Sequence, residues 1–236
     1  MIAAADLLSV WESGVTAGNA QRAALLHAVA RPDVPDLLAV PVGERDAELF
    51  ALRRSLFGRR IPVLLACAEC DEELEFDFDT MAVPQGGSIA DPITVTEGPW
   101  SVVLRVPTCG DVLAAAQSSS PRDVLLARCV LEAKCGNDSA AVTDLPAEVV
   151  GRVVDAAAQA DPGADIQLAV RCPECDSTAR AELDISVCLW TELDAWARAT
   201  LLDVAKLAAS FGWTEADILA MSPLRRRYYL ELAGHA

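Results

Sequence analysis

A CxxC pair stands between two strand-like runs in the stretch IPVLLACAECDEELEFDF, residues 61–78. The run after the pair, Glu73 to Phe78, alternates strictly between charged and apolar residues, as expected of a half-buried strand. The same arrangement occurs again in IQLAVRCPECDSTARAELDI, residues 166–185, where a second CxxC pair separates two largely alternating runs. Two strand–CxxC–strand units therefore occur in one chain, separated by residues 71–171.

The four cysteines of these two pairs have the spacing of a zinc site. Two residues between ligands let one tight turn direct both thiolates at one ion, and two such turns complete a tetrahedral site. The segment between the pairs is much longer than the usual spacing of about 15–20 residues. We still expect one structural Zn²⁺ because the two units need only be adjacent in space. Its predicted ligands are Cys67, Cys70, Cys172 and Cys175.

Two alternatives to a zinc site remain open at this stage. Thiol redox chemistry expects a CxxC pair at the start of a helix, whereas here a strand follows each pair. The other alternative is two incidental pairs that bind no metal. The remaining cysteines lie in or beside apolar helical patterns, which is typical of small buried hydrophobic residues. They are Cys109, Cys129, Cys135 and Cys188.

Composition and charge exclude several classes of protein. Of the 236 residues, 53% are hydrophobic and 23% charged, which indicates a globular chain. The net charge of −16 repels nucleic acid and anionic membrane surfaces, so neither is a predicted partner. The N-terminus has no basic region before its apolar residues, and the longest apolar run, Val63 to Ala68, is too short to span a membrane. We expect a cytoplasmic protein, where disulfides are disfavoured.

No catalytic motif is present. The chain has no Walker loop, no GxSxG and no HExxH. Its two histidines, His27 and His235, are far apart in the sequence. We therefore predict that the protein is not an enzyme.

The rest of the chain predicts mostly helices, with a loop over residues 83–99 and a strand over 100–106. The fold class that we predict is α+β and mostly helical, with a split zinc-ribbon-like small β-sheet, a helical insert and a C-terminal helical hairpin tail. Apolar periodicity predicts helices at 6–13, 19–30, 44–57, 109–117, 121–134 and 145–160, and a long helix from residue 186. The domains we expect are a helical lead-in at 1–58, a split zinc-ribbon region at 59–185 with its insert at 107–162, and the tail at 186–236.

The tail is also the predicted partner surface. Gly212 ends its long helix, Thr214 caps a short one, and Ser222-Pro223 begins a final helix. Three helices of this size are too few to bury all of their apolar side chains, and an exposed apolar patch marks a partner site. Arginines would form its polar rim. The predicted surface consists of Trp213, Ile218, Leu219, Met221, Leu224, Arg225, Arg226 and Arg227.

The order of these features resembles a known family. The two CxxC units, the insert, LWTELDAWAR at residues 189–198 and FGWTEADILAMSP at 211–223 together resemble the T4-type baseplate hub assembly chaperone family. The resemblance covers residues 50–233. It implies a non-enzymatic assembly chaperone or adaptor of a contractile phage tail or contractile injection system, whose partner is a baseplate hub or tape-measure-like protein. A permanent structural baseplate subunit is the alternative, and a CxxC redox enzyme is the third.

Overall fold

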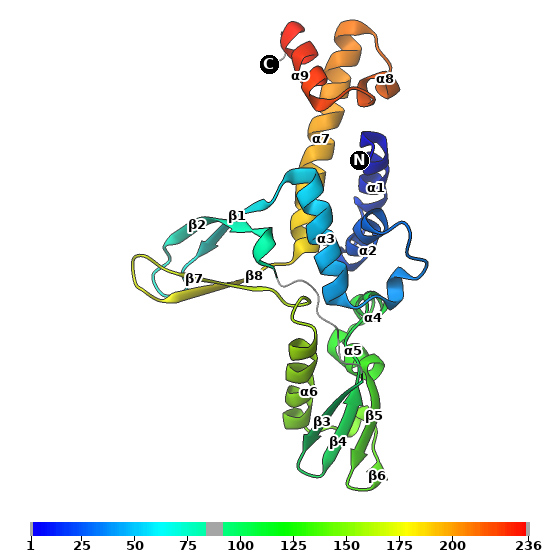
Figure 1. Cartoon of the computed structure of the whole chain (residues 1–236), viewed down its shortest axis with the longest axis vertical. Coiled ribbons are helices and arrows are strands. Elements are labelled where there is room, and N and C mark those ends of the chain that lie inside the picture. Colours follow the sequence, from blue (N-terminus) through cyan, green and yellow to red (C-terminus); the bar gives the residue numbers. More distant parts are fainter. Residues whose placement is uncertain (1, 84–91, 235–236) are drawn as a thin grey trace. The chain divides into compact units, whose positions relative to one another are not determined.

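The computed structural model of the chain describes residues 2–83 and 92–234, and it divides into two compact units (Figure 1). The first unit joins Met1–Leu26 to Val187–Ala236, and the second is His27–Ser186. Residues 1–58, which the sequence predicts as one helical lead-in, are therefore shared between the units. Among the described residues, no helix has both the length and the apolar character needed to cross a membrane.

The first unit is helical, and tryptophans hold its two chain segments together. The Trp11 indole N–H donates to Asp194 Oδ1 at 2.8 Å, and the Arg22 guanidinium lies 4.7 Å from the centre of the Trp190 ring. A Cβ on Gly14 would lie 2.2 Å from that ring, so only glycine permits this approach. The helices of this unit are α1 (Ala4–Gly14), most of α2 (Asn19–Ala30), nearly all of α7 (Ile185–Phe211), α8 (Glu215–Leu219) and α9 (Pro223–Leu232).

The helix boundaries in the tail are those that the sequence predicts. Gly212 ends α7 with a φ of 67°, in the left-handed region that favours glycine. Thr214 and Asp217 form a capping box at α8, and the Ser222 hydroxyl accepts the Arg225 N–H at the start of α9. The core of the tail consists of Val204, Leu207, Ile218 and Leu230.

The second unit contains a four-stranded antiparallel sheet in the order β3-β4-β5-β6. Helix α6 packs on β3 and β4 with its buried residues Val149, Val150 and Val153 (Figure 1). The strands are β3 (Ile93–Glu97), β4 (Trp100–Leu104), β5 (Val130–Cys135) and β6 (Asp138–Ser139). The helices are α3 (Val42–Phe57), α4 (Cys109–Ala116), α5 (Pro121–Cys129) and α6 (Ala147–Ala160), with 3₁₀ turns at Leu37–Ala39, Thr80–Ala82 and Val142–Asp144.

This sheet corrects two predictions. The helix predicted at 121–134 ends at Cys129, and β5 follows it, paired with β4. Leu131 to Lys134 are good helix formers, so tertiary pairing overrides their local preference. Strand β3 lies within the predicted loop at 83–99, of which residues 84–91 are outside the described part. The insert is therefore mixed α/β and not helical.

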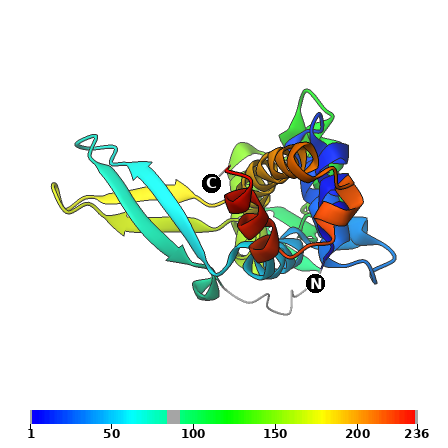
Figure 2. The ribbon, with the colours of Figure 1, turned by 90° about the horizontal axis from the view of Figure 1, so that it is seen from above.

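The two CxxC units form two separate hairpins, each a two-stranded antiparallel sheet. Strand β1 (Arg60–Ala66) pairs with β2 (Glu73–Asp79), and β7 (Gln167–Arg171) pairs with β8 (Thr178–Glu182). The two hairpins are neighbours, since β1 contacts β8, and they cross in the view of Figure 2. Helices combined with small antiparallel sheets agree with the predicted α+β class, while the strands beside the CxxC pairs form two hairpins instead of the one small sheet that the sequence predicts.

The start of α3 is held by the carboxylate of Asp161, the residue directly after α6. The Gly43 N–H donates to Asp161 Oδ2 at 2.9 Å, and Asp161 is buried. A carboxylate is favourable there because the N-terminus of a helix carries a partial positive charge. A Cβ on Gly43 would lie 1.8 Å from Asp161 Oδ1, so the contact requires glycine.

We predict that Gly43→Ala lowers the free energy of unfolding by about 1–3 kcal/mol, because the new methyl group displaces the Asp161 carboxylate. Gly151→Ala is the matched control: Gly151 lies within α6, and a Cβ there would meet nothing within 4 Å. That change should raise the free energy of unfolding by about 0.4–1 kcal/mol. Urea denaturation of both variants measures the difference, and equal effects would contradict the role given to Asp161.

Candidate metal centre

Each CxxC pair forms the same turn at the tip of its hairpin. In the first turn the Cys67 N–H donates to the Glu72 carbonyl at 2.8 Å, and the Asp71 N–H donates to the Cys67 carbonyl at 2.9 Å. The equivalent atoms of the second turn make the same two hydrogen bonds, at 2.9 and 3.0 Å. Asp71 and Asp176, each directly after a second cysteine, have φ values of 58° and 63°. Aspartate tolerates this left-handed conformation better than most residues.

The two turns bring the four predicted ligands into one cluster. Cys67 Sγ lies 3.6 Å from Cys175 Sγ, and Cys70 Sγ lies 3.6 Å from Cys172 Sγ. All four sulfur atoms lie within 4.8 Å of one another. Four thiolates at about 2.3 Å from a tetrahedral ion are about 3.8 Å apart, so these spacings fit a shared metal ion. All four are free thiols, since a disulfide needs its sulfurs about 2.05 Å apart.

The cluster has a buried side and an exposed side. Cys67 and Cys172, the first cysteine of each pair, are buried and pack with Leu74 and Ala179. The second cysteine of each pair is exposed. Since two of the four predicted ligands are fixed in a small apolar core, the cluster is held in place by the hairpins themselves.

Ser177 is a member of the site that no sequence pattern indicates. Its Oγ lies 3.2 Å from Cys67 Sγ and 3.0 Å from Cys175 Sγ, so one hydroxyl contacts a thiol of each pair. The hydrogen bond from Ser177, followed by one from the backbone of Glu69, lowers the pKa of the Cys67 thiol to about 6. The first turn has Glu72 at the position equivalent to Ser177, so the repeat alone does not reveal this contact.

The Cys70 thiol shifts in the opposite direction. A backbone hydrogen bond from Glu72 lowers its pKa, but hydrogen bonding with the Cys175 thiol, local desolvation and hydrogen bonding with the other two thiols outweigh this and raise the pKa to about 12. Thiolates this close repel one another, so the cluster ionises fully only around a cation. Metal binding is therefore expected to release protons.

The structure divides the predicted partner surface of the tail. Ile218 and Arg226 are buried, at 0% and 5% exposure, so they belong to the interior of the tail and not to its surface. They are buried because α8 and α9 turn these side chains toward the rest of the tail. The other predicted residues are half-buried or exposed: Trp213, Leu219 and Met221 are half-buried, and Leu224, Arg225 and Arg227 are exposed.

The other four cysteines do not join the cluster. Cys109 and Cys129 are buried, as predicted, while Cys135 and Cys188 are partly exposed. Within residues 2–83 and 92–234, the four-cysteine cluster is the one group of three or more His, Cys, Asp or Glu side chains placed to hold an ion together.

The comparison with known families matches the chain to the family described as T4 bacteriophage base plate protein, over residues 21–185. The chain belongs to this family. The match covers both CxxC turns and the insert, and it confirms the resemblance to a T4-type baseplate family. It stops where α7 begins, so the tail segments that contributed to the resemblance lie outside it. No curated protein and no solved structure matches the chain.

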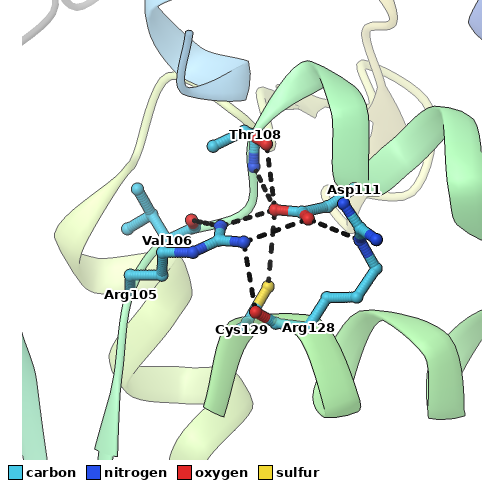
Figure 3. A network of polar contacts seen from close by, with 6 residues as sticks. All are labelled: Arg105, Val106, Thr108, Asp111, Arg128 and Cys129. Carbon is cyan, nitrogen blue, oxygen red and sulfur yellow. Dashed lines mark hydrogen bonds and ion pairs between the residues drawn. The ribbon is translucent and has the colours of Figure 1, made fainter. Parts of the chain in front are cut away.

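The part that matches the base plate family also contains a buried polar network centred on Asp111 (Figure 3). Asp111 is fully buried at the start of α4. Its Oδ2 accepts a hydrogen bond from Arg105 at 2.5 Å and another from the Thr108 N–H at 2.9 Å, and its Oδ1 accepts one from Arg128 at 2.7 Å. The network thus joins the end of β4 to α4 and α5.

The negative charge of Asp111 is compensated by its own hydrogen-bond donors within the protein. Burial by itself raises the pKa of Asp111, but the hydrogen bonds from Arg105, Thr108 and Arg128 outweigh it and hold the pKa well below its usual range. Because these donors occupy both of its oxygens, the carboxylate is not available as a general acid or base. Thr108-x-x-Asp111 is a capping pattern, which is the one sequence signal for this network.

Proposed function

We propose that this chain is a non-enzymatic assembly chaperone or adaptor for the baseplate hub of a contractile phage tail or contractile injection system, acting in the cytoplasm. The family match over residues 21–185 carries the baseplate part of this proposal. Its partner would be a hub or tape-measure-like protein. The net charge of −16 supports a protein partner over nucleic acid or an anionic membrane.

The polar clusters support a role without catalysis. Four thiolates fill a tetrahedral coordination shell, whereas a catalytic zinc keeps one position open for water or substrate. The Asp111 carboxylate is occupied by Arg105, Arg128 and Thr108. Each CxxC pair lies between strands and not at the start of a helix, which argues against thiol redox chemistry.

We further propose that the cluster holds one structural Zn²⁺ per chain. An all-thiolate set suits zinc, and the sulfur spacings fit its tetrahedral geometry. The bound ion would supply a cross-link between hairpins whose cysteines are as far as 108 residues apart in sequence. Neither hairpin alone has more than two strands, and a lone two-stranded hairpin is at best marginally stable in water.

Ser177→Ala tests the contact between the serine hydroxyl and the thiols. We predict zinc binding weaker by about 10-fold or more, the effect of removing a hydrogen-bond donor next to the ligands. Competition between the full chain and a chromophoric chelator measures the affinity. Ser177→Thr keeps the hydroxyl and should keep the affinity. If the alanine variant binds zinc as tightly as the wild type, the hydroxyl does not contribute to metal binding.

The chaperone role is tested on sheathed particles from a producing strain. Deleting the gene should abolish intact baseplates, because the hub would not assemble. Purified wild-type particles should then lack this chain when probed with an antibody. Stoichiometric retention of the chain would instead show the alternative, a permanent structural subunit. Intact particles from the deletion strain would contradict both roles.

A further inference from the structure

Helix α9 has a second apolar face that the tail does not bury. Leu224, Tyr228 and Leu232 are 65%, 61% and 77% exposed. They are spaced four residues apart, so they form one row along the helix. The row lies on the side opposite Arg226 and Leu230, the two buried side chains of this helix. One side of α9 therefore anchors the helix, and the other presents a row of apolar side chains to solvent.

The helix that carries this row is already formed and anchored. The Ser222 hydroxyl caps its first turn, where Pro223 stands at the first helical position. The Tyr229 ring packs edge-on against Trp213, with ring centres 4.8 Å apart, and Leu230 lies in the core of the tail. A partner would therefore bind a preorganised surface, without the entropic cost of ordering it.

Positive charge flanks the row. Arg225 and Arg227 are both exposed, and Arg225 makes no ion pair with any described residue. Arg227 is paired with Glu231 at 3.1 Å. On the opposite, buried side of the helix, Nε and Nη1 of Arg226 have no hydrogen-bond partner among the described residues. On the exposed side, Arg225 is the arginine without an ion pair to a described residue, and its charge favours an acidic group on the partner surface.

We propose that the outer face of α9 docks an amphipathic helix of another baseplate component, with Asp or Glu residues beside its apolar row. This inference rests on the proposed function for the source of the partner. Helix-to-helix docking fits because apolar residues at helical spacing on one partner contact the same pattern on the other. The carboxylates would lie beside Arg225 and Arg227, and the apolar rows would meet between them.

A second copy of this chain fits the face less well. On α9 the one carboxylate is that of Glu231, which is already paired with Arg227, so the α9 of a second copy would bring no unpaired carboxylate to Arg225. The row is also short, since eight residues of helix span about 12 Å. Stable dimers usually bury at least about 1,200 Å², more than one short helix face provides. A small contact binds weakly and releases readily, as a transient assembly partner requires.

Site-specific photo-cross-linking of the full chain in a producing strain tests this inference. The photoreactive residue p-benzoylphenylalanine replaces Tyr228, and the control position is Leu202, which is 55% exposed on α7. We expect at least 10-fold more adduct from Tyr228 than from Leu202. Mass spectrometry should locate the adduct in an acidic, helix-periodic segment of another baseplate protein.

Charge variants then test the arginine flanks. Arg225→Glu combined with Arg227→Glu should reduce the Tyr228 adduct at least 10-fold, whereas lysine at both positions should preserve it. The inference is overturned by an adduct no stronger than that of Leu202, by an adduct with a second copy of this chain alone, or by an adduct that charge reversal leaves unchanged.

The docking surface and the proposed function fail in different ways. If deleting the gene blocks assembly, wild-type particles lack the chain and Tyr228 still gives no adduct, the docking surface is wrong and the chaperone role stands. If the expected adduct forms and particles assemble without the chain, the docking surface stands and the chaperone role is wrong.

Discussion

Removal of the metal from the full chain should lower its melting temperature by about 10 °C or more. Structural zinc binds small finger peptides with about 10–16 kcal/mol of apparent free energy, and 1 kcal/mol shifts the melting temperature of a chain of this size by about 2–4 °C. The ion would also close a long loop, since Cys70 and Cys172 are 102 residues apart. Calorimetry before and after chelation measures the shift, and elemental analysis verifies that one zinc per chain has been removed.

The Cys70→Ser variant distinguishes the stability contributed by a bound ion from the stability contributed by packing of the cysteine side chain. The Cys70 side chain is exposed, so its replacement would cost little if no ion were bound. We expect loss of zinc, a similar drop in melting temperature, and faster hydrogen exchange in residues 61–78 and 164–185. Cys135→Ser, outside the cluster, is the control and should retain zinc. An unchanged melt after verified metal removal would mean that the hairpins do not depend on the ion.

Asp111→Asn should lower the free energy of unfolding by about 2–4 kcal/mol, because it removes the buried negative charge that is paired with Arg105 and Arg128. Part of the cost is relieved because the two arginine side chains are 25% and 47% exposed and reach water. Asp155→Asn is the control, since Asp155 is exposed on α6 and its loss should change stability by less than about 0.5 kcal/mol. Equal losses from both variants would contradict the network's role.

The same carboxylate makes stability depend on pH in a defined direction. Its pKa is lower in the folded chain than in the unfolded chain, so its contribution is present in full above about pH 4, the usual carboxyl range. The contribution is lost as the pH falls below this value, toward the lowered pKa. The stability difference between wild type and Asp111→Asn should therefore shrink between about pH 4 and pH 2, as followed by urea denaturation.

Local patterns in the sequence were sufficient for the hairpins and for the ends of the tail helices. The alternation around each CxxC pair predicts β1, β2, β7 and β8, since a period of two is a property of the strand itself. Gly212, Thr214 and Ser222 predict where the tail helices end and begin, because caps depend on the residue at one position. The four cysteines of the cluster follow from the same local patterns.

Contacts between distant segments decided what the sequence left open. Residues 130–135 contain good helix formers and become β5 only because β4 lies beside them, and Ser177 joins the cysteine cluster only because the two hairpins meet. Ile218 and Arg226 fit the predicted surface by residue type, yet the packing of the tail buries them and exposes Leu224, Tyr228 and Leu232. Cap and alternation signals act over a few residues and can be read from the chain itself. Burial depends on which elements pack together, so only the tertiary structure determines it.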